Sequence, residues 1–95
     1  MIYELGFLTE ALKEWRGLDQ QVRTQFKKKL AERLTNPRAP SAKLSGQKDR
    51  YKIKLRAAGF RLVYEVRDET MIVVVVAVGK RERDGAYRAA AGRNV

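Results

Sequence analysis

The segment "YKIKLRAAGFRLVYEVRDETMIVVVVAV", residues 51–78, predicts three successive strands and thereby decides the fold. Polar and apolar residues alternate over about 50–56 and 60–67, which is the pattern of half-buried strands. Residues 71–78 are apolar at every position and mostly β-branched. This third strand should therefore be central in the sheet and covered on both faces for much of its length. Residues 67–70 are expected to form the turn before it.

The first two strands form a hairpin whose register decides where its cations point. With Ala58-Gly59 as a two-residue loop, Arg56 pairs with Arg61 and the apolar residues stay together, whereas a three-residue loop would mix the faces. The apolar pattern therefore favours the two-residue loop. The aromatic residues then fall on the apolar face: Tyr51, Phe60 and Tyr64. Four cations project from the other face: Lys52, Lys54, Arg56 and Arg61.

This cationic face suggests a site for an anion. Like charges on neighbouring strands repel one another, and in the hairpin only Glu65, opposite Lys52, neutralises one of them. A single exposed cation on a strand is ordinary and discourages edge-to-edge pairing. For the whole cluster, in a chain with 21 Lys and Arg against 11 Asp and Glu, an anion site is the better interpretation. Nucleic acid is the commonest polyanionic partner of so basic a domain.

Composition limits the chemistry that such a site can use. The 95 residues suit one domain, taken as residues 1–95. The chain has no cysteine and no histidine, which excludes disulfides, thiolate metal sites and the usual proton shuttle. Acid–base chemistry must then use Lys, Arg, Tyr, Asp or Glu, and no metal or organic cofactor is expected. The longest apolar run has eight residues, far short of the roughly 20 of a membrane helix, and the acidic N-terminus is unlike a signal peptide, so we expect a cytoplasmic protein.

The front of the chain is expected to form a strand followed by a helical hairpin. Residues 2–7 are rich in strand formers. Thr9 is the expected N-cap of a first helix that Gly17 ends, and Asp19 is the expected N-cap of a second. The second helix carries an apolar stripe with a four-residue repeat and stops at Asn36-Pro37. The stripe consists of Val22, Phe26, Leu30 and Leu34.

The rest of the chain consists of a loop and a short tail helix. Residues 36–50 hold both prolines and are expected to form a loop anchored by Leu44. A tail helix is expected with Asp84 as cap and Gly92 as stop, and because its apolar residues are mainly alanines its docking should be weak. The fold class is therefore α+β: a small, mainly antiparallel sheet of about four strands with an N-terminal helical hairpin and a short C-terminal helix.

The segment after the buried strand, "VGKRERDGAYR", brings more charge to the end of the sheet. Lys80 and Arg81 follow the strand directly, and Arg81 would approach the cationic face if that strand lies next to the hairpin. A basic strand end is the simpler alternative. Tyr87 is either part of the site or a packing residue that anchors the tail helix.

Four stretches together resemble the RelE toxins of bacterial and archaeal toxin–antitoxin pairs. They are "LKEWRGL", "FKKKLAERLTNPR", "KLSGQKDRYKIKLRAAGFRLVYEV" and "VVVVAVGKRERDGAYRAA", and the likeness extends over essentially the whole chain. The resemblance implies the α+β fold above and a ribosome-dependent messenger-RNA interferase that cleaves the codon in the A site. It also implies a RelB-type antitoxin that wraps the toxin and keeps it inactive, and a toxin–antitoxin complex that represses its own operon.

The resemblance also transfers a catalytic set, because each position of the family motif carries the expected residue type. The set is Lys52, Lys54, Arg61, Arg81 and Tyr87. Further RNA contacts are expected from Lys43, Arg56, Lys80 and Arg83. Two positions depart from the pattern: Ser45 stands where a close relative carries Arg, and Phe60 where a relative carries Tyr. The first removes one expected RNA contact and the second one hydroxyl near the site.

Cleavage without histidine would proceed by attack of a ribose 2′-OH on the adjacent phosphate. Lys52 and Arg61 suit stabilisation of the charge that develops on the phosphate. Lys54 is a candidate base because neighbouring cations lower its pKa, although bound phosphate acts in the opposite direction. Arg81 is better suited to stabilise the leaving group than to donate a proton to it. Tyr87 remains a candidate base or a stacking surface.

Two other functions fit parts of the pattern. A ParE-like toxin would share the fold and inhibit gyrase by binding, but such relatives generally lack the catalytic set. A plain nucleic-acid-binding module would need more aromatic residues on the cationic face. The run 27–29 ("KKK") suits either ribosomal RNA or a solvated helix face. Displacement of the weakly docked tail helix by the antitoxin is a further hypothesis.

Overall fold

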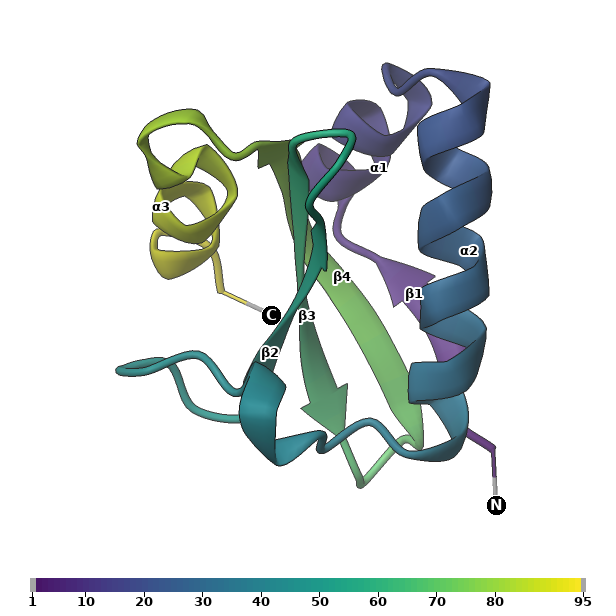
Figure 1. Ribbon diagram of the computed structural model, residues 1–95. Coiled ribbons are helices and arrows are strands. Elements are labelled where there is room, and N and C mark those ends of the chain that lie inside the picture. Colours follow the sequence, from purple (N-terminus) through teal and green to yellow (C-terminus); the bar gives the residue numbers. More distant parts are fainter. Residues whose placement is uncertain (1, 95) are drawn as a thin grey trace.

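A four-stranded sheet with helices on both faces makes up the described part of the chain, residues 2–94 of the computed structural model (Figure 1). In chain order the elements are β1 (Glu4–Phe7), α1 (Thr9–Arg16), α2 (Gln20–Thr35), the 3₁₀ turn η1 (Pro40–Ala42), β2 (Arg50–Leu55), β3 (Phe60–Arg67), β4 (Ile72–Lys80), the 3₁₀ turn η2 (Glu82–Asp84) and α3 (Gly85–Ala91). The strand order is β1-β4-β3-β2. β1 runs parallel to β4 and the other two pairings are antiparallel, so the predicted fold class is confirmed.

The sheet separates two apolar cores. α1 and α2 cover one face, and α3 covers the other (Figure 1). The larger core joins Trp15 and Phe26 of the helices to Ile53 and Tyr64 of the strands. β4 lies between β1 and β3, and residues 73–78 are all buried, as the unbroken apolar run predicts.

The predicted hairpin register is wrong by two residues. Leu55 pairs with Phe60 and Lys54 with Arg61, so the loop comprises the four residues 56–59. A two-residue loop would require a positive φ at Ala58, which costs a residue with a Cβ. In the longer loop only Gly59 has a positive φ, of 74°, and its amide donates to the carbonyl of Leu55. A shift of two residues keeps every side chain on its predicted face.

Local signals account for most element ends. Asp19 caps α2 as predicted, accepting from the amide of Gln20 at 3.1 Å. The predicted cap at Thr9 is wrong: Leu8 is the N-cap, because its amide still bonds the carbonyl of Val75 and holds the chain extended to that point. Asp84 occupies the N-cap position of α3 without a side-chain bond. Leu44, the expected loop anchor, is 7% exposed.

α3 docks through a small apolar contact and several polar ones. Its alanines at 86 and 90 meet a cluster of modest size on the sheet. The buried guanidinium of Arg50 donates to the carbonyls of Ala90 and Arg93 beyond it, the latter at 2.6 Å. Arg93 in turn bonds Glu14 of α1. The alanines alone predict a weakly held helix, and these polar contacts add to their packing.

Candidate active site

Three of the expected catalytic cations share the face of the sheet that α3 flanks. In β2 the side chains of Ile53 and Leu55 are buried against α2, so Lys52 and Lys54 between them point to the opposite face. Arg61 projects from β3 directly opposite Lys54. All three are half-buried. Strand alternation therefore brings together Lys52, Lys54 and Arg61, the part of the set that lies on the two hairpin strands.

The cluster changes the ionisation of its central lysine. The positive charge of Lys52 is the largest cause that lowers the pKa of Lys54, followed by partial desolvation and then by Arg61 and Arg56. Asp84 opposes this shift. A larger fraction of Lys54 is consequently neutral near pH 7 than of a free lysine. The direction is the one that the sequence predicts and that a general base requires.

A β-bulge in β4 changes which way the following residues point. The pairing with β3 slips between Val63 and Tyr64, which leaves Val76 as the extra residue of β4. Val76 and Ala77 consequently both pack on the α3 side of the sheet. Bulges commonly re-aim side chains next to functional sites.

The bulge brings Arg81 to the end of the cationic face. Gly79 faces α3: a Cβ built on it would lie 3.7 Å from the backbone nitrogen of Ala86. Arg81, two residues later, follows on the same side. Its amide donates to the carbonyl of Gly59 at 2.8 Å, and its Nε lies 3.8 Å from where a Cβ of Gly59 would stand. Unbroken alternation from Val73 would have sent Arg81 to the side of α1 and α2.

Tyr87 completes the set from α3 and has an unusual environment. Its side chain is half-buried against the smaller core. Burial raises the pKa of Tyr87, and the nearby Arg61 opposes that rise. The hydroxyl is buried and has no hydrogen-bond partner among the described residues. A buried hydroxyl without a partner is costly, which is consistent with a group that awaits a ligand.

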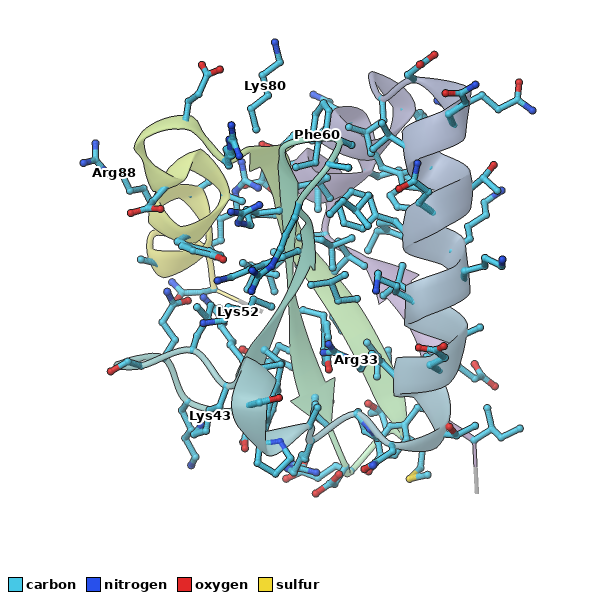
Figure 2. All side chains as sticks on the ribbon, viewed as in Figure 1. Arg33, Lys43, Lys52, Phe60, Lys80 and Arg88 are labelled. Carbon is cyan, nitrogen blue, oxygen red and sulfur yellow. The ribbon has the colours of Figure 1, made fainter. Side chains whose placement is uncertain are left out.

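The four expected RNA contacts do not form one cluster. Arg56 is exposed in the hairpin loop, next to the candidate catalytic lysines. Figure 2 shows Lys80 and Lys43 at opposite ends of the molecule. The ammonium of Lys43 lies 5.5 Å from the centre of the Tyr51 ring, outside the cluster. Arg83 belongs to η2, and its side chain lies outside what the structure describes.

The two departures from the family pattern lie in different surroundings. Ser45 is exposed in the loop before β2. Phe60 is half-buried and packs against the larger core. An added hydroxyl at position 60 would therefore lie at the end of the hairpin rather than among the lysines.

Asp84 is the one acidic residue that the sequence interpretation left out of the site. It acts on the pKa of both Lys54 and Tyr87, and raises each. It has a φ of 52° and stands exposed at the start of α3. Its influence on two catalytic candidates from different elements depends on the docking of α3, so only its place before Tyr87 in the chain could have suggested it.

Residues 2–94 give no sign of a metal site or of a membrane-spanning helix. No group of three or more acidic side chains there could hold a metal ion. No helix in that range is long and apolar enough to cross a membrane.

Comparison with known proteins agrees with the fold. Residues 5–85 match the family described as ParE toxin of the type II toxin–antitoxin system parDE. The mRNA interferase toxin RelE of Escherichia coli K12 is 55% identical over 93 residues, which cover 98% of each protein. A free E. coli RelE with two arginines replaced by alanine has a solved structure with a TM-score of 0.91, at 52% identity and 100% coverage of both chains. The same variant bound to a peptide of antitoxin RelB gives 0.83, at the same identity and coverage.

The fold, the cationic face and these likenesses define a toxin of a type II toxin–antitoxin system. The chain belongs to the RelE/ParE toxin family, and at 52–55% identity over nearly its full length it stands with the RelE toxins.

Proposed function

We propose that this protein is a messenger-RNA interferase, a toxin that cuts messenger RNA within the codon in the ribosomal A site. The observation that carries the proposal is the cluster of Lys52, Lys54 and Arg61 on one face, with Tyr87 on the facing helix. The RelE relative of E. coli bears the name of an mRNA interferase. The whole set of five residues is the proposed catalytic site.

The proposed reaction is attack of a ribose 2′-oxygen on the phosphate held at the 3′-oxygen of the same ribose, with the 5′-oxygen of the following nucleotide as the leaving group. The 2′-O–P bond forms, the P–O5′ bond breaks, and the products are a 2′,3′-cyclic phosphate and a free 5′-hydroxyl. Lys54, with its lowered pKa, takes the 2′-OH proton. Lys52 and Arg61 stabilise the negative charge that grows on the phosphate oxygens. No metal enters these steps, because fixed cations provide the charge.

The remaining two residues act at the edges of the reacting group. Arg81 stabilises the developing charge on the leaving 5′-oxygen, because its guanidinium scarcely releases a proton. Tyr87 has a raised pKa, which suits it to hydrogen-bond or stack on the RNA better than to accept a proton. The solvent or the protonated Lys54 then returns the proton to the leaving group.

The ribosome is proposed to supply what this small site lacks. A small site of half-exposed side chains does not hold a flexible RNA strand in one fixed orientation. Orientation contributes about 7–11 kcal/mol in favourable cases. We propose a RelB-type antitoxin as the natural inhibitor, because the E. coli RelE variant is solved with a RelB peptide. Toxin, ribosome and antitoxin would then meet in the cytoplasm.

Primer extension on messenger RNA with and without ribosomes tests this function. Cuts within A-site codons should need ribosomes and disappear in an Arg81→Ala, Tyr87→Ala variant. Arg88→Ala is the matched control, since Arg88 is an exposed cation of α3 that points away from the sheet (Figure 2). Intact message with the unaltered protein would overturn the proposal.

Inhibition of DNA gyrase is the second candidate, because the matching family is described as ParE toxin. A supercoiling assay with purified gyrase separates the two functions. Gyrase inhibition that survives the Arg81→Ala, Tyr87→Ala change, together with intact message, would establish this alternative.

A further inference from the structure

A cationic groove lies beside the proposed catalytic site, along the outer edge of β2. It has a volume of about 340 Å³ and lies between that edge strand and the C-terminal half of α2. Five of its eight lining residues are cations and none is acidic: Lys29, Arg33, Lys52, Lys54 and Arg56. Its two apolar lining residues, Ala42 and Ile53, are both buried. The groove therefore offers positive charge with little apolar surface.

Arg33 is fixed at the inner wall of this groove without an acidic partner. Its Nη1 donates to the carbonyl of Lys52 at 3.2 Å and to the hydroxyl of Tyr64 at 2.9 Å. That hydroxyl in turn donates to the carbonyl of Pro37 at 2.6 Å. Arg33 forms no ion pair within residues 2–94, and its other guanidinium donors stay without a protein acceptor there. A half-buried guanidinium held in one orientation is ready to bind an oxyanion.

The arrangement of charges in the groove favours a bound anion. Lys29 and Arg33 stand four residues apart on one face of α2, where like charges destabilise a helix. Arg33 also lies against the backbone of Lys52, whose own ammonium belongs to the catalytic cluster. Figure 2 shows Arg33 reaching from α2 towards the sheet and Lys52 on the α3 side of β2. Lys52 and Lys54 thus join groove and catalytic face into one positive path over the strand edge.

We propose that the groove binds backbone phosphates of the same single RNA strand that is cleaved, next to the scissile linkage. The ligand class rests on the proposed function, because the groove shares two lysines with the proposed site. An acidic peptide offers the same charge, but the groove exposes almost no apolar surface to hold its side chains. Lys29 and Arg33 are then RNA-binding residues beyond the catalytic set, and they contact the strand without reading its bases.

The salt dependence of RNA binding tests the groove. The probes are fluorescein-labelled 2′-O-methyl RNAs of three and nine nucleotides, which cannot be cleaved, with fluorescence anisotropy as the readout. Each lost phosphate contact lowers the slope of log K against log salt by about 0.7 for a single strand. Lys29→Ala and Arg33→Met should each lower the slope by about this amount with the nine-mer and leave it unchanged with the three-mer. Lys27→Ala, an exposed cation on the other side of α2, is the control and should change neither.

Several results would overturn the proposal that the groove binds RNA phosphates. Equal loss of slope in Lys27→Ala would show general attraction to a basic helix, and an unchanged slope in Lys29→Ala would show that the groove binds no phosphate. If the variants lose slope only in binding a duplex RNA hairpin, or only in binding a poly-glutamate peptide, the groove would bind that ligand and not a single RNA strand. Circular dichroism confirms that Arg33→Met is folded, and Lys29→Ala, an exposed residue, provides the test without that concern. This test measures binding and not cleavage. If the protein binds RNA in this way but does not cut messenger RNA, only the proposed function is refuted.

Discussion

Glu14 of α1 and Arg93, two residues past α3, are joined by hydrogen bonds of 2.8 and 3.0 Å between carboxylate and guanidinium. Arg93 also donates to the carbonyl of Val76 at 2.9 Å, and Glu14 accepts from the amide of Val78 at 3.1 Å. Glu14 is the main cause of a raised pKa at Arg93. The end of the tail is therefore tied both to α1 and to β4, and the position of Tyr87 depends on this tie.

Breaking this tie should loosen the tail without unfolding the protein. Glu14→Gln removes the charge and one acceptor, and because both side chains are partly exposed we expect a loss of at most about 1 kcal/mol. Amide hydrogen exchange should accelerate in α3 and stay unchanged in β4, apart from Val78, whose amide donates to Glu14. Glu10→Gln is the matched control: Glu10 adds to the field at Arg93 but makes no bond to it. Equal acceleration in both variants would mean that net charge, and not this contact, holds the tail.

Arg50 should matter to global stability as well as to the tail. Its buried guanidinium donates to Glu65 at 3.0 Å and to the carbonyls of Ala90 in α3 and of Arg93 beyond it. Arg50→Met leaves Glu65 with Arg67 as its one cationic partner among the described residues. It also removes a donor from the carbonyls of Ala90 and Arg93, although Ala90 keeps the amide of Arg93. We therefore expect a loss of about 3 kcal/mol in urea denaturation. A double variant with Glu65→Gln should recover part of that loss. If Arg50→Met lowers the free energy of unfolding by less than about 1 kcal/mol, water readily replaces the contacts of Arg50.

The elements of this fold are predictable where a local pattern carries the information. The four-residue apolar repeat of α2 and the unbroken apolar run of β4 each define an element and its burial. The cationic face is predictable for a related reason: strand alternation survives an error of two residues in register. The sequence therefore predicts that one face holds Lys52, Lys54 and Arg61, although it predicts the wrong cross-strand partner for each of them.

The remaining features depend on information that no local pattern holds. The bulge at Val76 lies in a run of valines, where no alternation marks the change of face. The length of the hairpin loop depends on the cost of a positive φ at Ala58, and the apolar pattern carries no information about that cost. The contacts of Arg50 and Glu14 with the tail join residues 40 or more positions apart. Only the docked tail reveals them.

Tyr87→Phe should separate stability from activity. The hydroxyl of Tyr87 is buried without a partner among the described residues, so its removal relieves a desolvation cost. We expect the free energy of unfolding to stay equal or rise by up to about 1 kcal/mol in urea denaturation, while cleavage of message on the ribosome falls. A clear loss of stability would reveal a hydrogen bond in the free protein, with Arg61 the nearest candidate. Unchanged cleavage would remove the hydroxyl from the mechanism.

The pH dependence of cleavage should identify Lys54 as the base. Cleavage then increases as the pH rises through the pKa of Lys54, because only the neutral amine accepts the 2′-OH proton. Asp84 raises that pKa, so Asp84→Asn should move the rising limb of the single-turnover rate to lower pH. Asn also tolerates the positive φ at this position. Lys52 lowers the same pKa, so Lys52→Gln should move the limb to higher pH, as well as reducing the maximal rate.

The opposite directions of these two shifts make the pH test specific. A change in substrate binding alone would alter the height of the profile and leave its midpoint in place. Glu69→Gln, an exposed charge change in the turn between β3 and β4, controls for the field of the whole protein and should move neither limb. If both site variants shift the limb in the same direction, the titrating group is not Lys54. If the limb persists in Lys54→Met, the base lies elsewhere, and Tyr87 would be the next residue to test.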